Sequence, residues 1–242
     1  KWQRGAEAEL FALRRAVAMG YNAGEALRVL QKGRGVLAQS LVPPGIAGHD
    51  PGWKLGAQVY DPAASRALLD RFGYRDRDGD GFRETPDGKP LVLERWSAPT
   101  SAQRQADELW KKNMDAIGLK IAIRKDKLPE LRKMARAGRI PFASDGWNAD
   151  YPDAENFMQL LYGPNAGQEN QPRFRLPEYD RLYQEARKLP DGRERTAIFG
   201  KMQELVVAYA PMRFTQHVVE DHAWHARVKN YRAHPIRQFS FP

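Results

Sequence analysis

The chain has 242 residues, of which 42% are hydrophobic, enough to bury a core as one large domain or two small ones. It has no cysteine, which excludes disulfides, thiolate zinc sites and cysteine catalysis. The net charge of +9 comes from basic residues spread along the chain, without a block of five or six like charges or a nucleic-acid-binding motif, so we expect no nucleic-acid partner.

In the first half of the chain, helical and extended patterns alternate. Leu10, Leu13 and Val17, with Phe11 and Ala16 alongside, mark the inward face of a helix over 7–19, and Asn22 is the expected N-cap of a second helix. Asp61 followed by a proline predicts the start of a third. The remaining expected elements are an extended segment over 35–45, strands over 91–96 and 119–124, and a helix over 101–117.

The second half predicts mostly helices. A short helix is expected from Pro129 to Gly138, a helical piece over 156–161, a helix from Pro177 and another over 191–209. The last portion reads as extended. Strands interrupted by single helices predict an α/β fold with a mixed sheet flanked by helices.

One stretch concentrates polar chemistry: Asp145-Gly146-Trp147-Asn148-Ala149-Asp150-Tyr151-Pro152-Asp153. Its glycine and X-Pro step argue against a helix. Acids beside an aromatic ring on an irregular segment are typical of a site for a cationic group. The alternative is an acidic surface turn that caps the following helix, with Trp147 in the core.

A second acidic segment, over 76–87, has the spacing of a calcium loop. The candidate ligands are Asp76, Asp78, Asp80, the carbonyl of Phe82, and Asp87 in place of the usual glutamate. The alternative is a turn-rich hairpin connection without metal. Apart from calcium here, we expect no cofactor.

The five histidines offer little for catalysis. His222 and His225 could suggest the metal site of a hydrolase, but on a strand this spacing places the two rings on opposite faces. No nucleophile-elbow or zinc-protease motif is present. We therefore expect no enzyme, and the hydrolase is kept as the alternative from another class.

Six segments in order carry a resemblance to a known family. They are Leu13-Arg14-Arg15-Ala16-Val17, Tyr21-Asn22, Gly33 through Pro43-Pro44-Gly45, Tyr60-Asp61-Pro62 through Gly73-Tyr74, Asp78-Gly79-Asp80-Gly81 through Leu91, and Gly146-Trp147-Asn148-Ala149-Asp150-Tyr151-Pro152-Asp153 with Asn156-Phe157. Over nearly its whole length the chain resembles the large C-terminal lobe of family-5 extracellular solute-binding proteins, the peptide- and nickel-type receptors of ABC importers.

The resemblance implies a two-lobed, periplasmic-binding-protein-like fold of type II, cluster C, with most of the first lobe missing here. Residues 1–213 would form the ligand-binding lobe, and residues 214–242 would return to the missing lobe. The protein would be periplasmic or extracellular. The chain shows no signal-peptide pattern, so it would be a mature or trimmed form.

The resemblance also implies a function: capture of a small solute and its delivery to an ABC permease in the membrane, by a monomeric receptor. A short peptide or another amino-bearing compound is the expected ligand, with a sugar or a metal chelate as the alternative. Asp150 would pair with the ligand ammonium, Trp147 would form a wall, and Asn148 and Ala149 would lie beside them.

Overall fold

The computed structural model describes residues 6–54, 56, 59–219 and 223–229. Its helices are α1 (Ala6–Gly20), α2 (Ala23–Leu30), α3 (Pro62–Arg71), α4 (Ser101–Asp115), α5 (Leu128–Arg136), α6 (Glu155–Met158), α7 (Pro177–Ala186) and α8 (Arg193–Tyr209), with short 3₁₀ turns η2 (Gln159–Leu161) and η3 (Gly163–Asn165). Its strands are β1 (Val36–Leu37), β2 (Val92–Ser97), β3 (Lys120–Lys125) and β4 (Gln216–His217). In this described part, no helix is long and apolar enough to cross a membrane.

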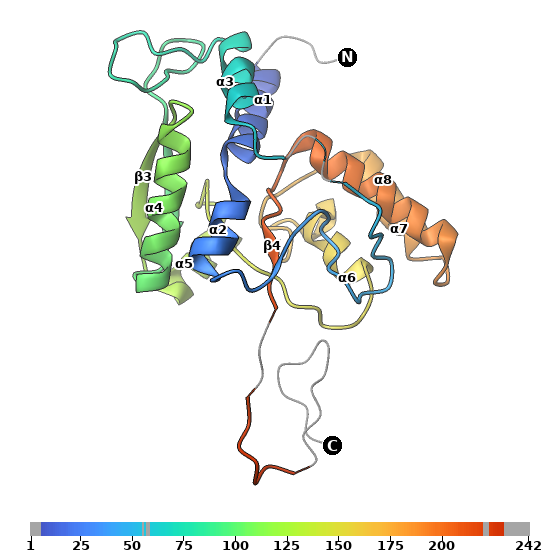
Figure 1. Ribbon diagram of the computed structural model, residues 1–242. Helices are drawn as coiled ribbons and strands as arrows, with labels where there is room; N and C mark the ends of the chain where they lie inside the picture. Colours follow the sequence, from blue (N-terminus) through green and yellow to red (C-terminus); the bar gives the residue numbers. More distant parts are fainter. Residues whose placement is uncertain (1–5, 55, 57–58, 220–222, 230–242) are drawn as a thin grey trace.

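The apolar side chains form two cores. One core joins α1, α2, α3 and α4 to β2 and β3, with Trp110, Met114 and Ile117 at its centre. The other joins α6, α7 and α8, with Phe157 and Met202 among its buried members. In Figure 1, α4 and β3 lie on the left, and α7 and α8 lie side by side on the right. Any segment that runs from the first core to the second has to cross between them.

The strands form two separate pairs. β2 and β3 are parallel, with Val92 opposite Lys120 and Ser97 opposite Lys125. On the other side of β2, Phe142 bridges Arg95 in the parallel direction. β1 and β4 pair antiparallel. The α/β class with flanking helices is confirmed, and the mixed strand directions are divided between two small sheets.

Local signals placed the helix starts correctly. The side chain of Asn22 accepts a hydrogen bond from the backbone N–H of Glu25, and Asp61 does the same for Ala64. These bonds satisfy amide groups that the first turn leaves without an intrahelical partner.

The predicted inward face of α1 is partly wrong. Leu10 is 48% exposed, whereas Ala12 and Ala16 are buried beside Leu13. The small residues allow α3 to approach closely, and the hydroxyl of Ser65 on α3 donates to the carbonyl of Ala16 at 2.8 Å. The larger side chain of Leu10 lies outside this contact.

A buried ion pair fixes β2 against α4. Arg95 Nε donates to Asp107 Oδ1 at 2.9 Å, and the two side chains are 0% and 4% exposed. The other carboxylate oxygen accepts hydrogen bonds from Ser97 and from Lys125 on β3. Aromatic rings of Trp110 and Phe142 lie 5.4 and 5.3 Å from the Arg95 guanidinium carbon. The pair therefore ties two strands and a helix to the segment that follows Phe142.

Replacing Asp107 with alanine should strongly destabilise the fold, because it leaves the Arg95 charge buried without its partner. We expect a loss of about 3–5 kcal/mol in the free energy of unfolding, measured by urea denaturation. The control is Glu94→Ala, which removes the exposed pair between Glu94 and Arg124 on the same two strands. That change should cost about 1 kcal/mol or less, and equal losses for both variants would contradict the argument.

Candidate functional site

The stretch over 145–153 runs between the two cores. Phe142 packs against the first core, and Ala154 lies inside the second. Residues 143–149 have no regular secondary structure, and most of the stretch is exposed. Among the described residues, no backbone–backbone hydrogen bond involves residues 145–150. The backbone N–H groups of Gly146 and Asp150 bond to side chains, and the peptide groups of residues 147–149 are open to solvent or to a ligand.

The side chain of Asn156 holds this stretch in place through hydrogen bonds. Its side chain is fully buried, in the first turn of α6. The Asn156 Oδ1 atom accepts hydrogen bonds from the Trp147 indole at 2.8 Å and from the backbone N–H of Asp150 at 3.1 Å. Its Nδ2 group donates to Asp150 Oδ2 at 3.0 Å. One buried amide thus sets the position of both Trp147 and Asp150.

The four predicted ligand contacts lie together but differ in exposure. Asp150 and Asn148 are exposed, and Trp147 is 37% exposed. Ala149 is half-buried and packs against the second core. The second carboxylate oxygen of Asp150, Oδ1, has no hydrogen bond within the described part of the chain. Part of the Trp147 side chain and one carboxylate oxygen of Asp150 are therefore available on residues that bond to the same asparagine.

The other two acids of the stretch are engaged by the protein. Asp153 accepts a hydrogen bond from the backbone N–H of Glu155 at 2.7 Å and forms an ion pair with Arg195. Asp145 accepts one from Gln171 at 3.2 Å. Asp153 therefore holds the first turn of α6 and ties it to α8. The two alternatives for the stretch, a helix cap and a cation site, apply to different acids: Asp153 bonds to the start of α6, and Asp150 is exposed.

The carboxylates that cluster in the acidic loop differ in part from the ligands that its spacing predicts. Carboxylate oxygens of Asp76, Asp78, Asp80 and Glu84 all lie within 4.8 Å of one another. Asp87 is not in this group: it pairs with Lys89 at 2.6 Å, and the hydrogen bond from Lys89 lowers the Asp87 pKa to about 2.

Within the loop, the carboxylates already accept backbone hydrogen bonds. Asp76 accepts from Gly79 and Gly81, and Asp80 accepts from Phe82. These bonds are those of a turn-rich connection, and oxygen ligands also suit calcium. The calcium site stays a prediction.

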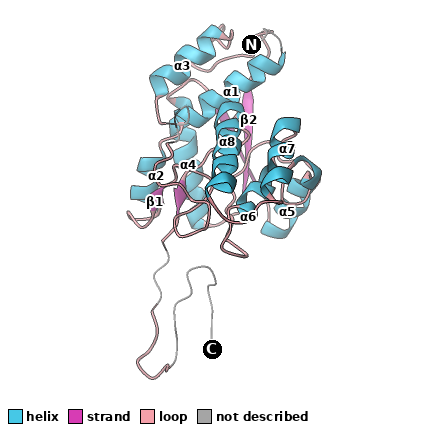
Figure 2. Ribbon diagram, turned by 90° about the vertical axis from the view of Figure 1, so that its right-hand side faces the viewer, coloured by secondary structure: helices cyan, strands magenta, loops and turns pink. Residues whose placement is uncertain are grey.

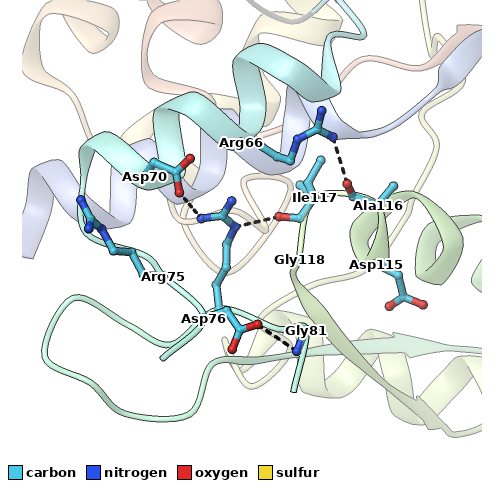
Figure 3. Close-up of a pocket in the computed structure, with 10 residues that line it drawn as sticks. Arg66, Asp70, Arg75, Asp76, Gly81, Asp115, Ala116, Ile117 and Gly118 are labelled. Carbon is cyan, nitrogen blue, oxygen red and sulfur yellow. Dashed lines mark hydrogen bonds and ion pairs between the residues drawn. The ribbon is translucent and has the colours of Figure 1, made fainter. Parts of the chain in front are cut away.

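A pocket of about 470 Å³ lies beside this loop (Figure 3). It opens between α3, the loop over 75–81 and the carboxyl end of α4. Two of its three arginines are used inside the protein, since Arg66 donates to the carbonyl of Ala116, and Arg83 donates to Ile117 and pairs with Asp70. These contacts satisfy carbonyls that the end of α4 leaves unpaired. None of the residues that line the pocket belongs to the stretch over 145–153.

The described residues do not support the alternative of a hydrolase with a metal site at His222 and His225. His222 lies outside the described residues, and His225 is exposed, with its Nδ1 atom accepting from the backbone N–H of Arg227. In the part of the chain that the structure describes, the acidic loop is the one group of three or more side chains suited to hold a metal.

Comparison with known proteins shows the family of this chain. The sequence profile for bacterial extracellular solute-binding proteins, family 5 middle region, matches residues 11–169. The chain belongs to this family. The match includes the acidic loop and the whole stretch over 145–153.

Similar curated proteins include heme-binding protein A of Haemophilus influenzae, 29% identical over 89% of this chain and 38% of that protein. Di/tripeptide-binding protein 2 of Pseudomonas aeruginosa is 26% identical over 94% of this chain and 42% of that protein. The chain therefore spans about two-fifths of the length of the curated relatives it matches.

Solved structures confirm the fold. The oligopeptide-binding protein AppA of Bacillus subtilis, in complex with a nonapeptide, aligns with a TM-score of 0.78 at 16% identity, over 87% of this chain and 42% of that one. NikA of Brucella suis, in complex with Fe(III)-EDTA, aligns with a TM-score of 0.74 at 20% identity, over 88% and 43%. At such low identity these likenesses establish the fold alone.

Replacing Asn156 with alanine should release both Trp147 and Asp150. We expect a loss of about 2 kcal/mol in the free energy of unfolding, since buried partners are left unpaired. The indole N–H resonance of Trp147, assigned with Trp147→Phe, should shift towards that of a solvent-exposed indole. Asn165→Ala is the control, because its amide donates only to the carbonyl of Gln159. An unchanged resonance in Asn156→Ala would show that the amide does not hold the ring.

Calcium binding can be tested by calorimetry. If the acidic loop binds calcium, titration of the metal-free protein at millimolar calcium should give heat, and Asp78→Asn should remove it, because each lost carboxylate weakens an oxygen-ligand site. Asp87→Asn should leave the heat unchanged, since Asp87 lies outside the group of four carboxylates. If the unmodified protein gave no heat, the acidic loop would not be a calcium site.

Proposed function

We propose that this chain is the ligand-holding lobe of a substrate-binding component of an ABC importer. It captures a small solute, with a short peptide or another amino-bearing compound as the best-supported class, and performs no chemistry on it. The full receptor works outside the cytoplasm, as a monomer, and delivers the solute to a permease in the membrane. The division at residue 213, with 214–242 returning to the other lobe, belongs to the same proposal.

The observation that carries this proposal is the combination of groups on the stretch over 145–153. Asp150 presents one carboxylate oxygen that no described residue uses, Trp147 presents part of its ring, and the backbone between them has no backbone partner. A carboxylate forms a charge-assisted hydrogen bond with an ammonium group. Open backbone amides and carbonyls can pair with those of an extended peptide.

The position of the stretch in the fold supports a ligand site. Residue 142 pairs in parallel with β2, so the chain enters the stretch from the carboxyl edge of the parallel strands. Ligands of open α/β sheets bind outside this edge. Similarity to di/tripeptide- and dipeptide-binding proteins supports the peptide class.

Capture without catalysis also fits the site. The family is one of solute-binding proteins. Asp150 is fixed by Asn156, and the neighbouring acids are paired with Gln171 and Arg195. Such an arrangement recognises a charged group through preset hydrogen-bond acceptors and offers no paired nucleophile and base.

The test is ligand affinity of the full-length receptor carrying Asp150→Asn. We expect short-peptide affinity to fall by about ten- to a hundredfold, because one charge-assisted hydrogen bond to the ammonium is lost. Isothermal calorimetry with a free and an N-acetylated peptide gives the measurement, and acetylation should abolish most of the difference between the two proteins.

The matched control is Asp145→Asn, which makes the same change of charge on the same stretch. Its affinity should stay within about twofold of the unmodified receptor, since Asp145 bonds to Gln171. If Asp150→Asn bound the peptide as tightly as the control, the assigned role of Asp150 would be wrong.

A further inference from the structure

Basic residues occur along the whole chain, but most of the net positive charge lies in one short region. Residues 120–139 contain eight basic and two acidic residues, so they carry six of the nine net positive charges of the whole chain. The region spans β3, α5 and the turn after α5. No run of five like charges occurs in it, and the concentration becomes evident only when charge is counted over the whole region.

The basic side chains gather on the solvent face of α5. Leu131 is buried, and Met134 and Ala135 are half-buried, so these three define the inward face. Side chains of the opposite face, which we call the basic face, are all exposed: Arg132, Lys133 and Arg136. Helical geometry places these three within one arc of about 100°. Lys127 and Arg139 flank the helix and are also exposed.

These cations are not neutralised within the described residues. No ion pair or side-chain hydrogen bond is recorded for any of the five, whereas nearby Arg124 and Lys125 pair with Glu94 and Asp107. Arg132 and Arg136 are four residues apart, a spacing at which like charges destabilise a helix slightly. The uncompensated charge therefore points outward, towards an anionic partner.

The composition of the basic face indicates what kind of partner it fits. Protein interfaces have an apolar or aromatic centre that excludes water. Between residues 124 and 140, Leu128 is the one exposed large hydrophobic residue in the described chain, and there is no aromatic ring on the basic face. A bilayer of anionic lipids needs neither shape complementarity nor a central anchor, and it attracts clusters of Lys and Arg on amphipathic helices.

We propose that the basic face of α5 docks on the anionic phospholipid surface of a membrane, with Leu128 entering the headgroup region. α5 leads from β3 to residue 142 and so flanks the stretch over 145–153. Docking would hold the lobe at the membrane where the permease lies, which is the one point that rests on the proposed function. Binding itself depends on the charges of α5 and requires no ligand.

The experiment measures partitioning of the purified 242-residue chain onto vesicles, by flotation. Vesicles of phosphatidylcholine alone are compared with vesicles containing about one-third phosphatidylglycerol, at about 0.05 M and 0.5 M salt. We expect binding to the anionic vesicles at low salt, loss of that binding at high salt, and none to neutral vesicles.

The decisive variant is R132Q/K133Q/R136Q, and its matched control is R71Q/K188Q/K201Q. The control removes three other exposed cations for which the described residues provide no ion pair, so both proteins have the same net charge. Glutamine keeps the helix propensity, and circular dichroism checks that both variants are folded. The first variant should lose about tenfold or more in partition coefficient, and the control should stay within about threefold.

Each outcome decides the proposal. Absence of binding by the unmodified chain, or equal losses for the two variants, overturns it. If the vesicle result is negative but R132Q/K133Q/R136Q in the full receptor weakens stimulation of the permease ATPase, the partner is an acidic protein face and the membrane proposal is wrong. Peptide affinity of Asp150→Asn is a separate measurement. A negative vesicle result therefore leaves the proposed function untouched, and an unchanged peptide affinity leaves the membrane proposal untouched.

Discussion

The candidate site depends on one constraint: an exposed stretch without secondary structure must be held in a single shape by buried polar side chains at its two ends. At the first end, Arg95 Nη1 donates to the hydroxyl of Ser144 at 3.1 Å, from a guanidinium that Asp107 already holds. At the second end, Asn156 bonds to Trp147 and Asp150. Buried polar groups without partners are costly, so each anchor stabilises the stretch in the one arrangement that satisfies it. In Figure 2, α4 and α6, which carry Asp107 and Asn156, are separate helices, with α4 to the left of α8 and α6 below α8.

Whether the sequence predicts a feature of the fold or of the site depends on how far apart in the chain the interacting residues are. Helix starts at Asn22 and Asp61 were correct because a cap acts within three residues. The role of Arg95 could not be read from the sequence, since its partners Asp107 and Ser144 are 12 and 49 residues away. Asn156 lies only six residues from Asp150, and an asparagine beside Phe157 and Met158 in a predicted helix was a usable signal. Spacing alone named Asp87 for the acidic loop, whereas the turn brings Glu84 to the other acids.

One fold serves different solutes. The solved structures that share the fold of this chain include complexes with a nonapeptide, with mannohexaose and with Fe(III)-EDTA. The choice of solute therefore depends on the side chains of the site and not on the fold. In this chain Asp150 is exposed, so a change there leaves the apolar packing intact, and it affects the protein only through the hydrogen bond from the Asn156 amide. Changing Asn156 would disturb both, because it is buried and bonds to two residues of the stretch.

The charges of the stretch over 145–153 and of α5 together bear on which ligand charge the proposed site would favour. Two of the three acids between residues 145 and 153 are engaged by Gln171 and Arg195, so one carboxylate, that of Asp150, is left to attract an ammonium. The flanking helix α5 exposes arginines and lysines, whose repulsion of a net cation is largely screened beyond about 8 Å in physiological salt. Under the proposed function, the ammonium of a zwitterionic ligand would pair with Asp150, and its carboxylate would be favoured by the net positive charge of the chain. An unmodified short peptide would satisfy both interactions, whereas a simple amine would satisfy only the first.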